Sequence, residues 1–386
     1  MIAMFDSRIR DRIVTAALLG AVLATRTYGQ DAQTTAAAER TALVAMLHSE
    51  ASEFDKAKAC QRLAVVGDAQ TVPALATLLG DVHLSNYARY ALEAIPDRTA
   101  GAALREAVTQ VKGDLVVGML SSIGRRRDVA AVELLGQLLD DQNLAIAKAA
   151  ARALGTIGDT RAADVLAASL ATPKPDLRAA VANACLICGD QLVKQGQPDR
   201  ALDLYDTVRA ADVPNHLARA ATSQMIIAGG NSGLRLLAQQ LDADDPSQFQ
   251  LAIHAVRLLD SSAADDVTHV LSNRFDAQSP SQQLLMLSAL RDLGSRQSLA
   301  TVVKAAEQGD PNVRVQAIRA LAELADASVV PLLLKTASQS DKTLSRAAME
   351  TLAKLTGHEI NSAIVKRLSS DDAGLRLMAI QMAGLR

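Results

Sequence analysis

The chain has 386 residues, of which 49% are hydrophobic and only 2% aromatic, so its core must consist of thin layers of Ala, Leu, Val and Ile rather than large rings. Its formal net charge of −2 gives no sign of a nucleic-acid polyelectrolyte contact, so we expect no nucleic-acid partner. Three cysteines cannot form a disulfide framework.

Residues 1–30 have the pattern of an export signal. Three arginines within residues 8–12 precede an uncharged apolar run over 13–24, and small residues follow up to Gly29. The apolar run is too short for a comfortable membrane span. We therefore predict a cleaved signal peptide, no stable membrane insertion afterwards, and a periplasmic or secreted protein. An uncleaved anchor or an ordinary N-terminal helix is the alternative.

Beyond the signal, one short motif recurs at intervals of about 28–34 residues. It has an apolar residue, a second one three positions later, then Gly or Pro, then Asp. This pattern predicts two helices in each repeat, with the first ending at Gly or Pro and Asp capping the second. Neither helix can bury its apolar stripe alone, so we predict an all-α fold, an α-α superhelix of about ten stacked hairpins. The motif occurs at 63–68, 92–97, 154–159 and 185–190, and weaker copies end near Gly229, Asp260, Gly294, Ala325 and Gly357.

The stretch DPNVRVQAIRALAELADASVVPLLL, residues 310–334, resembles a HEAT repeat of the short type also seen in phycobilin-lyase-like proteins. HEAT repeats often carry an Asp before the first helix and an Arg inside it. Asp310 with Arg314, and Asp372 with Arg376, match that pattern. The resemblance implies that these pairs form a hydrogen-bonded ladder between neighbouring repeats.

Residues 196–214 differ from the other repeats and resemble the second helix of a tetratricopeptide repeat, with Ala201 and Tyr205 at matching positions. Residues 371–386 have the pattern of a first helix without its partner, so we expect the last repeat to be incomplete. Either the sequence is a fragment of something longer, which we prefer, or another molecule covers that end. The predicted domains are a signal peptide at 1–30, HEAT-like repeats at 31–190, a tetratricopeptide-like hairpin segment at 191–215, and HEAT-like repeats at 216–386.

The CLIC stretch contains the residues most suggestive of chemistry. Cys185 and Cys188 have the spacing of a redox pair or of half a metal site. However, the repeat register places both where other repeats carry Leu, Val or Ile, so we predict that they pack in the core. No second Cys pair, nucleophile elbow, phosphate-binding loop or zinc-protease helix is found in the sequence. We therefore predict no catalytic, cofactor-binding or metal-binding residues, and no cofactor.

The candidate partner-binding residues are one tyrosine and three arginines. Tyr87 and Tyr90 lie three residues apart on one predicted helix, where helical geometry puts Tyr87 on the flank, packed against a neighbouring repeat, and Tyr90 nearly opposite the core. Arg125, Arg126 and Arg127 fall in a turn, where they are either solvated or poised to contact an anion. Exposed Tyr and Arg are favoured in interfaces, so Tyr90 and the three arginines are our candidates.

These observations favour an exported, non-catalytic HEAT-repeat scaffold that mediates protein–protein interaction. Its partner would be another protein or a downstream domain of the same polypeptide. The alternative is an enzyme-associated protein, either the helical module of a larger secreted enzyme or a lyase-like protein that attaches a chromophore.

Overall fold

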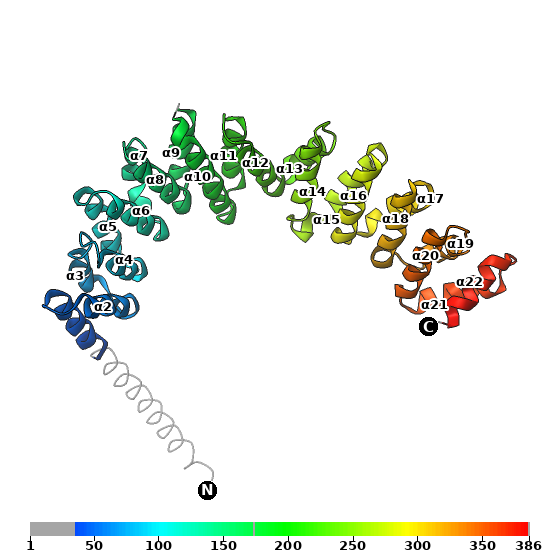
Figure 1. Cartoon of the computed structure of the whole chain (residues 1–386), viewed down its shortest axis with the longest axis horizontal. Helices are drawn as coiled ribbons and strands as arrows, with labels where there is room; N and C mark the ends of the chain where they lie inside the picture. Colours follow the sequence, from blue (N-terminus) through cyan, green and yellow to red (C-terminus); the bar gives the residue numbers. More distant parts are fainter. Residues whose placement is uncertain (1–34, 173, 385–386) are drawn as a thin grey trace, which may run out of the picture. The chain divides into compact units, whose positions relative to one another are not determined.

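The computed structural model of the chain describes residues 35–172 and 174–384, which contain helices and no β-strand (Figure 1). The predicted signal peptide at 1–30 therefore lies outside the described residues. The chain divides into two compact units, Met1–Arg200 and Ala201–Arg386, with the division inside one helix of the predicted 191–215 segment. Each unit is a stack of helical hairpins, which confirms the predicted all-α solenoid.

In unit 1, a helix over residues 35–48 precedes hairpins whose two helices fall into separate layers. The first layer contains α2, α4, α6, α8 and α10, and the second contains α3, α5, α7 and α9 (Figure 1). The bounds are α2 Glu53–Val66, η1 Ala69–Thr71, α3 Val72–Ala76, α4 Ser85–Ala94, α5 Arg98–Gln110, α6 Asp114–Arg125, η2 Val129–Ala131, α7 Val132–Leu138, α8 Leu144–Ile157, α9 Thr160–Ala171, α10 Pro175–Lys194 and, across the division, α11 Pro198–Ala210.

Unit 2 continues the same alternation of first and second helices. Short 3-10 turns precede several of the second helices, as they do in unit 1. The bounds are α12 Asn215–Ala228, α13 Gly230–Leu241, α14 Pro246–Val256, η3 Ser261–Ala263, α15 Ala264–Arg274, η4 Phe275–Ala277, α16 Pro280–Leu293, η5 Arg296–Ser298, α17 Leu299–Gln308, α18 Pro311–Leu324, η6 Ala327–Val329, α19 Val330–Ala337, α20 Lys342–Lys354, α21 His358–Lys366, η7 Arg367–Ser369 and α22 Ala373–Gly384.

The recurring Gly–Asp motif sets the helix ends as predicted in most repeats. Asp97 begins α5 by accepting a hydrogen bond from the backbone N–H of Thr99 at 2.8 Å, and Asp159 begins α9 by accepting from that of Ala162 at 2.8 Å. At the end of α8, Gly158 has a φ of 65°, which a residue with a Cβ adopts only at a cost. The hairpins therefore follow from short local signals.

The motif at 185–190 is the exception, because α10 continues through it to Lys194 and the predicted helix end is wrong. The additional turns bury Leu192 completely, and the side-chain amide of Gln195 donates to the carbonyl of Gly158 at 2.9 Å. That turn therefore packs against the C-terminal end of α8, where Ile157 and Gly158 are buried. Burying one leucine contributes about 2 kcal/mol, which outweighs the cost of about 1 kcal/mol for a glycine inside a helix.

Small residues let the first-layer helices of unit 1 approach closely. A Cβ on Gly124 of α6 would lie 3.0 Å from the Cα of Ala153 in α8. A Cβ on Gly155 of α8 would lie 2.7 Å from the backbone oxygen of Ala184 in α10. The first layer lies on the inner side of the curve of unit 1 (Figure 1). Close packing is consistent with this place, because helices on the inner side of a curved stack lie closer together. The two contacts also show that Gly124 and Gly155 are equivalent positions in successive hairpins.

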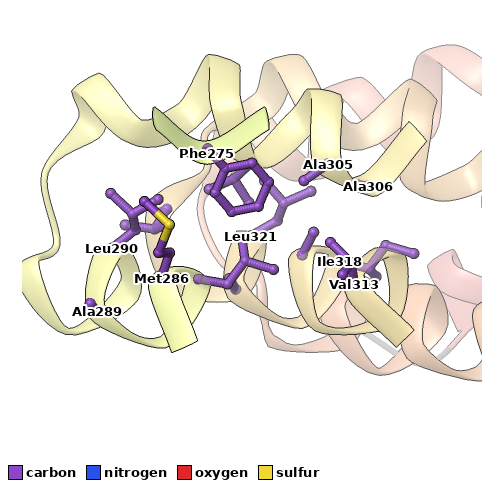
Figure 2. Packing of buried hydrophobic residues seen from close by; sticks show 14 of the residues in the cluster. Phe275, Met286, Ala289, Leu290, Ala305, Ala306, Val313, Ile318 and Leu321 are labelled. Carbon is purple, nitrogen blue, oxygen red and sulfur yellow. The ribbon is translucent and has the colours of Figure 1, made fainter. Parts of the chain in front are cut away.

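The core of unit 2 is a continuous apolar cluster that includes the aromatic ring of Phe275. Phe275, from η4, is 2% exposed and packs in the same cluster as Met286, Leu290 and Leu321, which come from α16 and α18 (Figure 2). Neighbouring hairpins thus fill one another's gaps, as a stack of repeats requires.

The Asp and Arg of the implied ladder act separately. Asp310 caps its own helix, α18, by accepting from the backbone N–H of Asn312 at 3.0 Å. The Nε of Arg314 donates to the carbonyl of Ala306 in α17 at 3.1 Å, so the arginine joins neighbouring hairpins. Asp372 likewise caps α22.

Candidate protein-binding groove

A depression of about 400 Å³ lies on the first-layer surface of unit 1, between α2, α4 and α6. We call it the tyrosine groove. It contains Tyr90 and Arg125 of the four predicted binding residues. Its lining residues are Gln61, Asn86, Tyr87, Arg89, Tyr90, Glu93, Ser121 and Arg125.

Two tyrosines form the aromatic wall of this groove. Tyr90 is 55% exposed, as predicted from its angle to the core. Tyr87 is half-buried on the flank of the same helix, α4, and also lines the groove. The pair therefore belongs to one surface rather than to two, and gives that surface two rings that each combine an apolar body with a polar hydroxyl group.

The floor of the groove is held by Arg89, which spans from α4 to α6. Its guanidinium donates to the carbonyl of Gly118 at 3.0 Å, to the Oγ of Ser122 at 3.1 Å, and to the Oδ1 of Asn86 at 3.0 Å. Burial lowers the pKa of Arg89, and the nearby carboxylate of Glu93 offsets part of that shift. The Nε of Arg89 is buried without a hydrogen-bond partner.

Glu93 joins the floor to the rim. Its Oε1 accepts from the Oγ of Ser122 at 2.6 Å, and its Oε2 accepts from the guanidinium of Arg125 at 3.1 Å. The side chain of Glu93 is 16% exposed, whereas that of Arg125 is 71% exposed. One carboxylate thus anchors a buried network and leaves most of the Arg125 head group facing solvent, with donors to spare.

A glycine makes room for this network. A Cβ on Gly118 would lie 2.8 Å from the Cζ of Arg89 and 3.0 Å from its Nε. The guanidinium therefore lies flat against the backbone of α6, where a larger residue would displace it.

The three adjacent arginines point to three different places. Arg125 reaches the groove. Arg126 turns back to α4, where it donates to the carbonyls of Leu92 and Ile95 and, at 2.8 Å, to that of Asp97. Burial lowers its pKa, and neighbouring carboxylates oppose that shift. Arg126 thus caps the C-terminal end of α4.

Arg127 leaves the groove region altogether. It has a φ of 50°, and its guanidinium donates to the Oε1 of Gln191 in α10 at 2.7 Å. The sequence grouped the three arginines because they are adjacent. In the structure only Arg125 shares a surface with Tyr90.

The comparison with protein families agrees with this architecture. The family model for HEAT repeats matches residues 114–186 and 267–353. The chain contains HEAT repeats. The first match begins with α6, which supplies one wall of the tyrosine groove, so part of the groove is built from a matched HEAT repeat.

Several solved structures are similar to the chain in fold. One is human deoxyhypusine hydroxylase in complex with glycerol, at 15% identity over 82% of this chain and 97% of that chain, with a TM-score of 0.30. Another is the karyopherin Kap121p bound to the extreme C-terminus of the protein phosphatase Cdc14p, at 12% identity over 89% of this chain and 45% of that chain, with a TM-score of 0.47. The complex of CpcE and CpcF of phycocyanin lyase from a Nostoc species is similar at 19% identity over 60% of this chain and 91% of that chain, with a TM-score of 0.33. No curated protein matches the chain.

The cysteines of the HEAT repeats lie in the core, as predicted. Cys185 and Cys188 of α10 are both fully buried and free. Burial raises the pKa of Cys188 to about 12 and that of Cys185 further still. A thiol held in this form is a poor nucleophile.

Residues 35–172 and 174–384 contain no group of three or more His, Cys, Asp or Glu side chains that could hold a metal ion. Within the same ranges, none of the helices has the length and apolar character needed to cross a bilayer.

Sequence reasoning missed Arg89, Glu93 and Ser122, which form the hydrogen-bond network between α4 and α6 at the groove. Arg89 and Glu93 are four residues apart on α4, a spacing that places two side chains on one helix face. That signal was present in the sequence. Their partners in α6 could be found only with the register between hairpins, which the repeat spacing gives to within a few residues.

Proposed function

We propose that this chain is an exported, non-catalytic HEAT-repeat scaffold, and that unit 1 binds a segment of a protein partner in the tyrosine groove. The observation that carries the proposal is Tyr90, a 55% exposed ring beside a network that fixes the groove floor. A rigid floor lowers the entropy cost of binding, and exposed tyrosines with a nearby arginine are enriched among binding hot spots.

Export rests on the sequence of residues 1–30, and the partner is another protein or a further domain of the same polypeptide. The chromophore-attachment alternative gains no support from Cys185 and Cys188, since both thiols are buried and protonated. A scaffold needs neither thiol.

The binding proposal is tested by photo-crosslinking in the producing cells. p-Benzoylphenylalanine replaces Tyr90 in one variant and Ala102, an exposed residue of α5 in the other layer, in the control. We expect a discrete adduct from position 90 only, and truncation of Tyr90 to Ala should weaken binding of the captured partner at least about fivefold. Equal labelling at both positions, or none at position 90, would contradict the proposal.

Export is tested separately on the same material. N-terminal sequencing of protein recovered from the periplasm or medium should begin near residue 30. An intact Met1 on protein confined to the cytoplasm would refute export and leave the groove proposal standing.

A further inference from the structure

We infer that the partner segment is an extended acidic peptide, which places an apolar residue in the tyrosine groove and carboxylates on α8. This inference rests on the proposed function. It follows from the charges beside the groove and from the register that connects α4 with α8.

The register is fixed by contacts that recur from helix to helix. Glu93 of α4 accepts a hydrogen bond from Ser122 of α6, and Gly124 of α6 packs against Ala153 of α8. The two members of each pair are 29 residues apart in the sequence. Glu93 and Gly124 therefore hold equivalent places in successive hairpins, and Gly155 holds the next one.

The residues three positions before these form a row across the first layer that is exposed at both ends. They are Tyr90 on α4, Ser121 on α6 and Arg152 on α8. Tyr90 and Ser121 both line the groove, and Arg152 is exposed. The row therefore leads from the tyrosine groove directly onto α8.

This end of the row is positively charged. Lys148 and Arg152 are one turn apart on α8, and both are exposed. Helix α8 contains no acidic residue, and no described residue pairs with either side chain. Together with Arg125 at the groove rim, they form a strip of cations that fits carboxylates.

The spacing defines the peptide further. Packed helices lie about 8–10 Å apart, so Tyr90 and Arg152 are separated by about 16–20 Å across α6. An extended chain rises about 3.3 Å per residue. The apolar anchor and the first carboxylate should therefore be about five or six residues apart.

A peptide fits this surface better than a nucleic-acid strand does. Glu93 lines the groove together with the two tyrosines, and its carboxylate pairs with Arg125. A nucleic-acid strand would place a phosphate next to this fixed carboxylate, and the two negative charges would repel each other. A peptide can present a neutral residue there.

The test uses the full-length chain and a phage-displayed library of random 12-residue peptides. We expect enrichment of peptides with one apolar or proline residue and, five or six positions away, one or more Asp or Glu. A fluorescein-labelled synthetic peptide of the enriched sequence then gives the affinity by anisotropy.

Charge reversal on α8 is the decisive comparison. Replacing Lys148→Glu and Arg152→Glu together should weaken the labelled peptide about tenfold or more and flatten its salt dependence. The control is Arg319→Glu, which reverses one exposed cation of α18 in unit 2 and should leave affinity unchanged. Circular dichroism confirms that the variants are folded.

Each alternative outcome has a distinct meaning. Enriched peptides without acids that still depend on Tyr90 would overturn this inference and leave the proposed function intact. Acidic peptides that bind the reversed variant equally well would also overturn it. If a 20-nucleotide single-stranded DNA bound more tightly than any peptide, the inference of a peptide partner would be wrong and a nucleic acid would be favoured instead. Enrichment of nothing would overturn the peptide inference, whereas the proposed function stands or falls with the crosslinking at position 90.

Discussion

Arg126→Met should destabilise α4, although the arginine lies on the surface loop after α6. The guanidinium donates to the carbonyls of Leu92, Ile95 and Asp97, which lie at and just beyond the end of α4. A hydrogen bond from a charged donor contributes about 1.5–3 kcal/mol when buried. This side chain is half-buried and water can rehydrate part of the carbonyls, so we expect a total loss of about 2 kcal/mol. Methionine retains the aliphatic packing of the arginine stem.

The two adjacent arginines provide matched controls. Arg125→Met loses an exposed ion pair with Glu93, and Arg127→Met loses one hydrogen bond to Gln191, so each should cost no more than about 1 kcal/mol.

Native-state hydrogen exchange with mass spectrometry measures the loss of stability of α4 separately from the rest of the chain. A loss of about 2 kcal/mol corresponds to exchange about 30-fold faster in the peptide covering 85–97. Equal acceleration in all three variants, or none in Arg126→Met, would refute the assignment of Arg126 as the cap of α4.

Three further predictions follow from packing and titration. Gly155→Ala forces a Cβ against the backbone of α10 and should cost about 1–3 kcal/mol in thermal unfolding, whereas Gly136→Ala in α7 meets only a valine methyl and should be neutral or slightly stabilising. At pH 8, Cys185 and Cys188 should not react with a disulfide reagent until urea unfolds the chain, because burial keeps both thiols protonated; rapid labelling of the native protein would contradict their burial. Hydrogen bonds from the side chain and the backbone N–H of Thr99 lower the pKa of Asp97. The stability that Asp97 contributes is therefore present above its unfolded pKa of 3.8 and is lost as the pH falls through its lower folded pKa. Asp97→Asn still caps α5 and should reduce the dependence of unfolding on acid pH.

Local signals in the sequence predicted much of the fold. Helix ends at Gly158 and Gly294 were predictable because glycine adopts a positive φ at low cost, and both have one. The continuation of α10 past 185–190 was not predictable in this way. It depends on the burial of Leu192 and on Gln195 reaching Gly158 across the hairpin stack.

The candidate site was predictable only in part, for a related reason. The exposure of Tyr90 follows from its angle on one helix, so the sequence is enough. The roles of Arg125, Arg126 and Arg127 depend on what each meets in α4 or α10, and adjacency in the chain says nothing about that. Repeat periodicity locates equivalent helices, while side-chain networks between them need the register to a single residue.

The tyrosine groove lies where the close packing of the first layer is replaced by a polar network. Between α6, α8 and α10, glycine and alanine at the recurring contact bring the helices together. Between α4 and α6, Glu93 and Ser122 occupy that contact, and Arg89 fills the space above Gly118. Longer side chains at the same position leave room for a depression, and the tyrosines of α4 border it.

This replacement has an energetic cost that packing alone does not explain. The buried Nε of Arg89 lacks a partner, and an unsatisfied buried donor costs about 1–3 kcal/mol. Small residues at these positions would continue the tighter contact already present between α6 and α8. At this repeat, which departs from the tighter packing of its neighbours, the exposed ring of Tyr90 borders the depression, as the proposed binding surface would require.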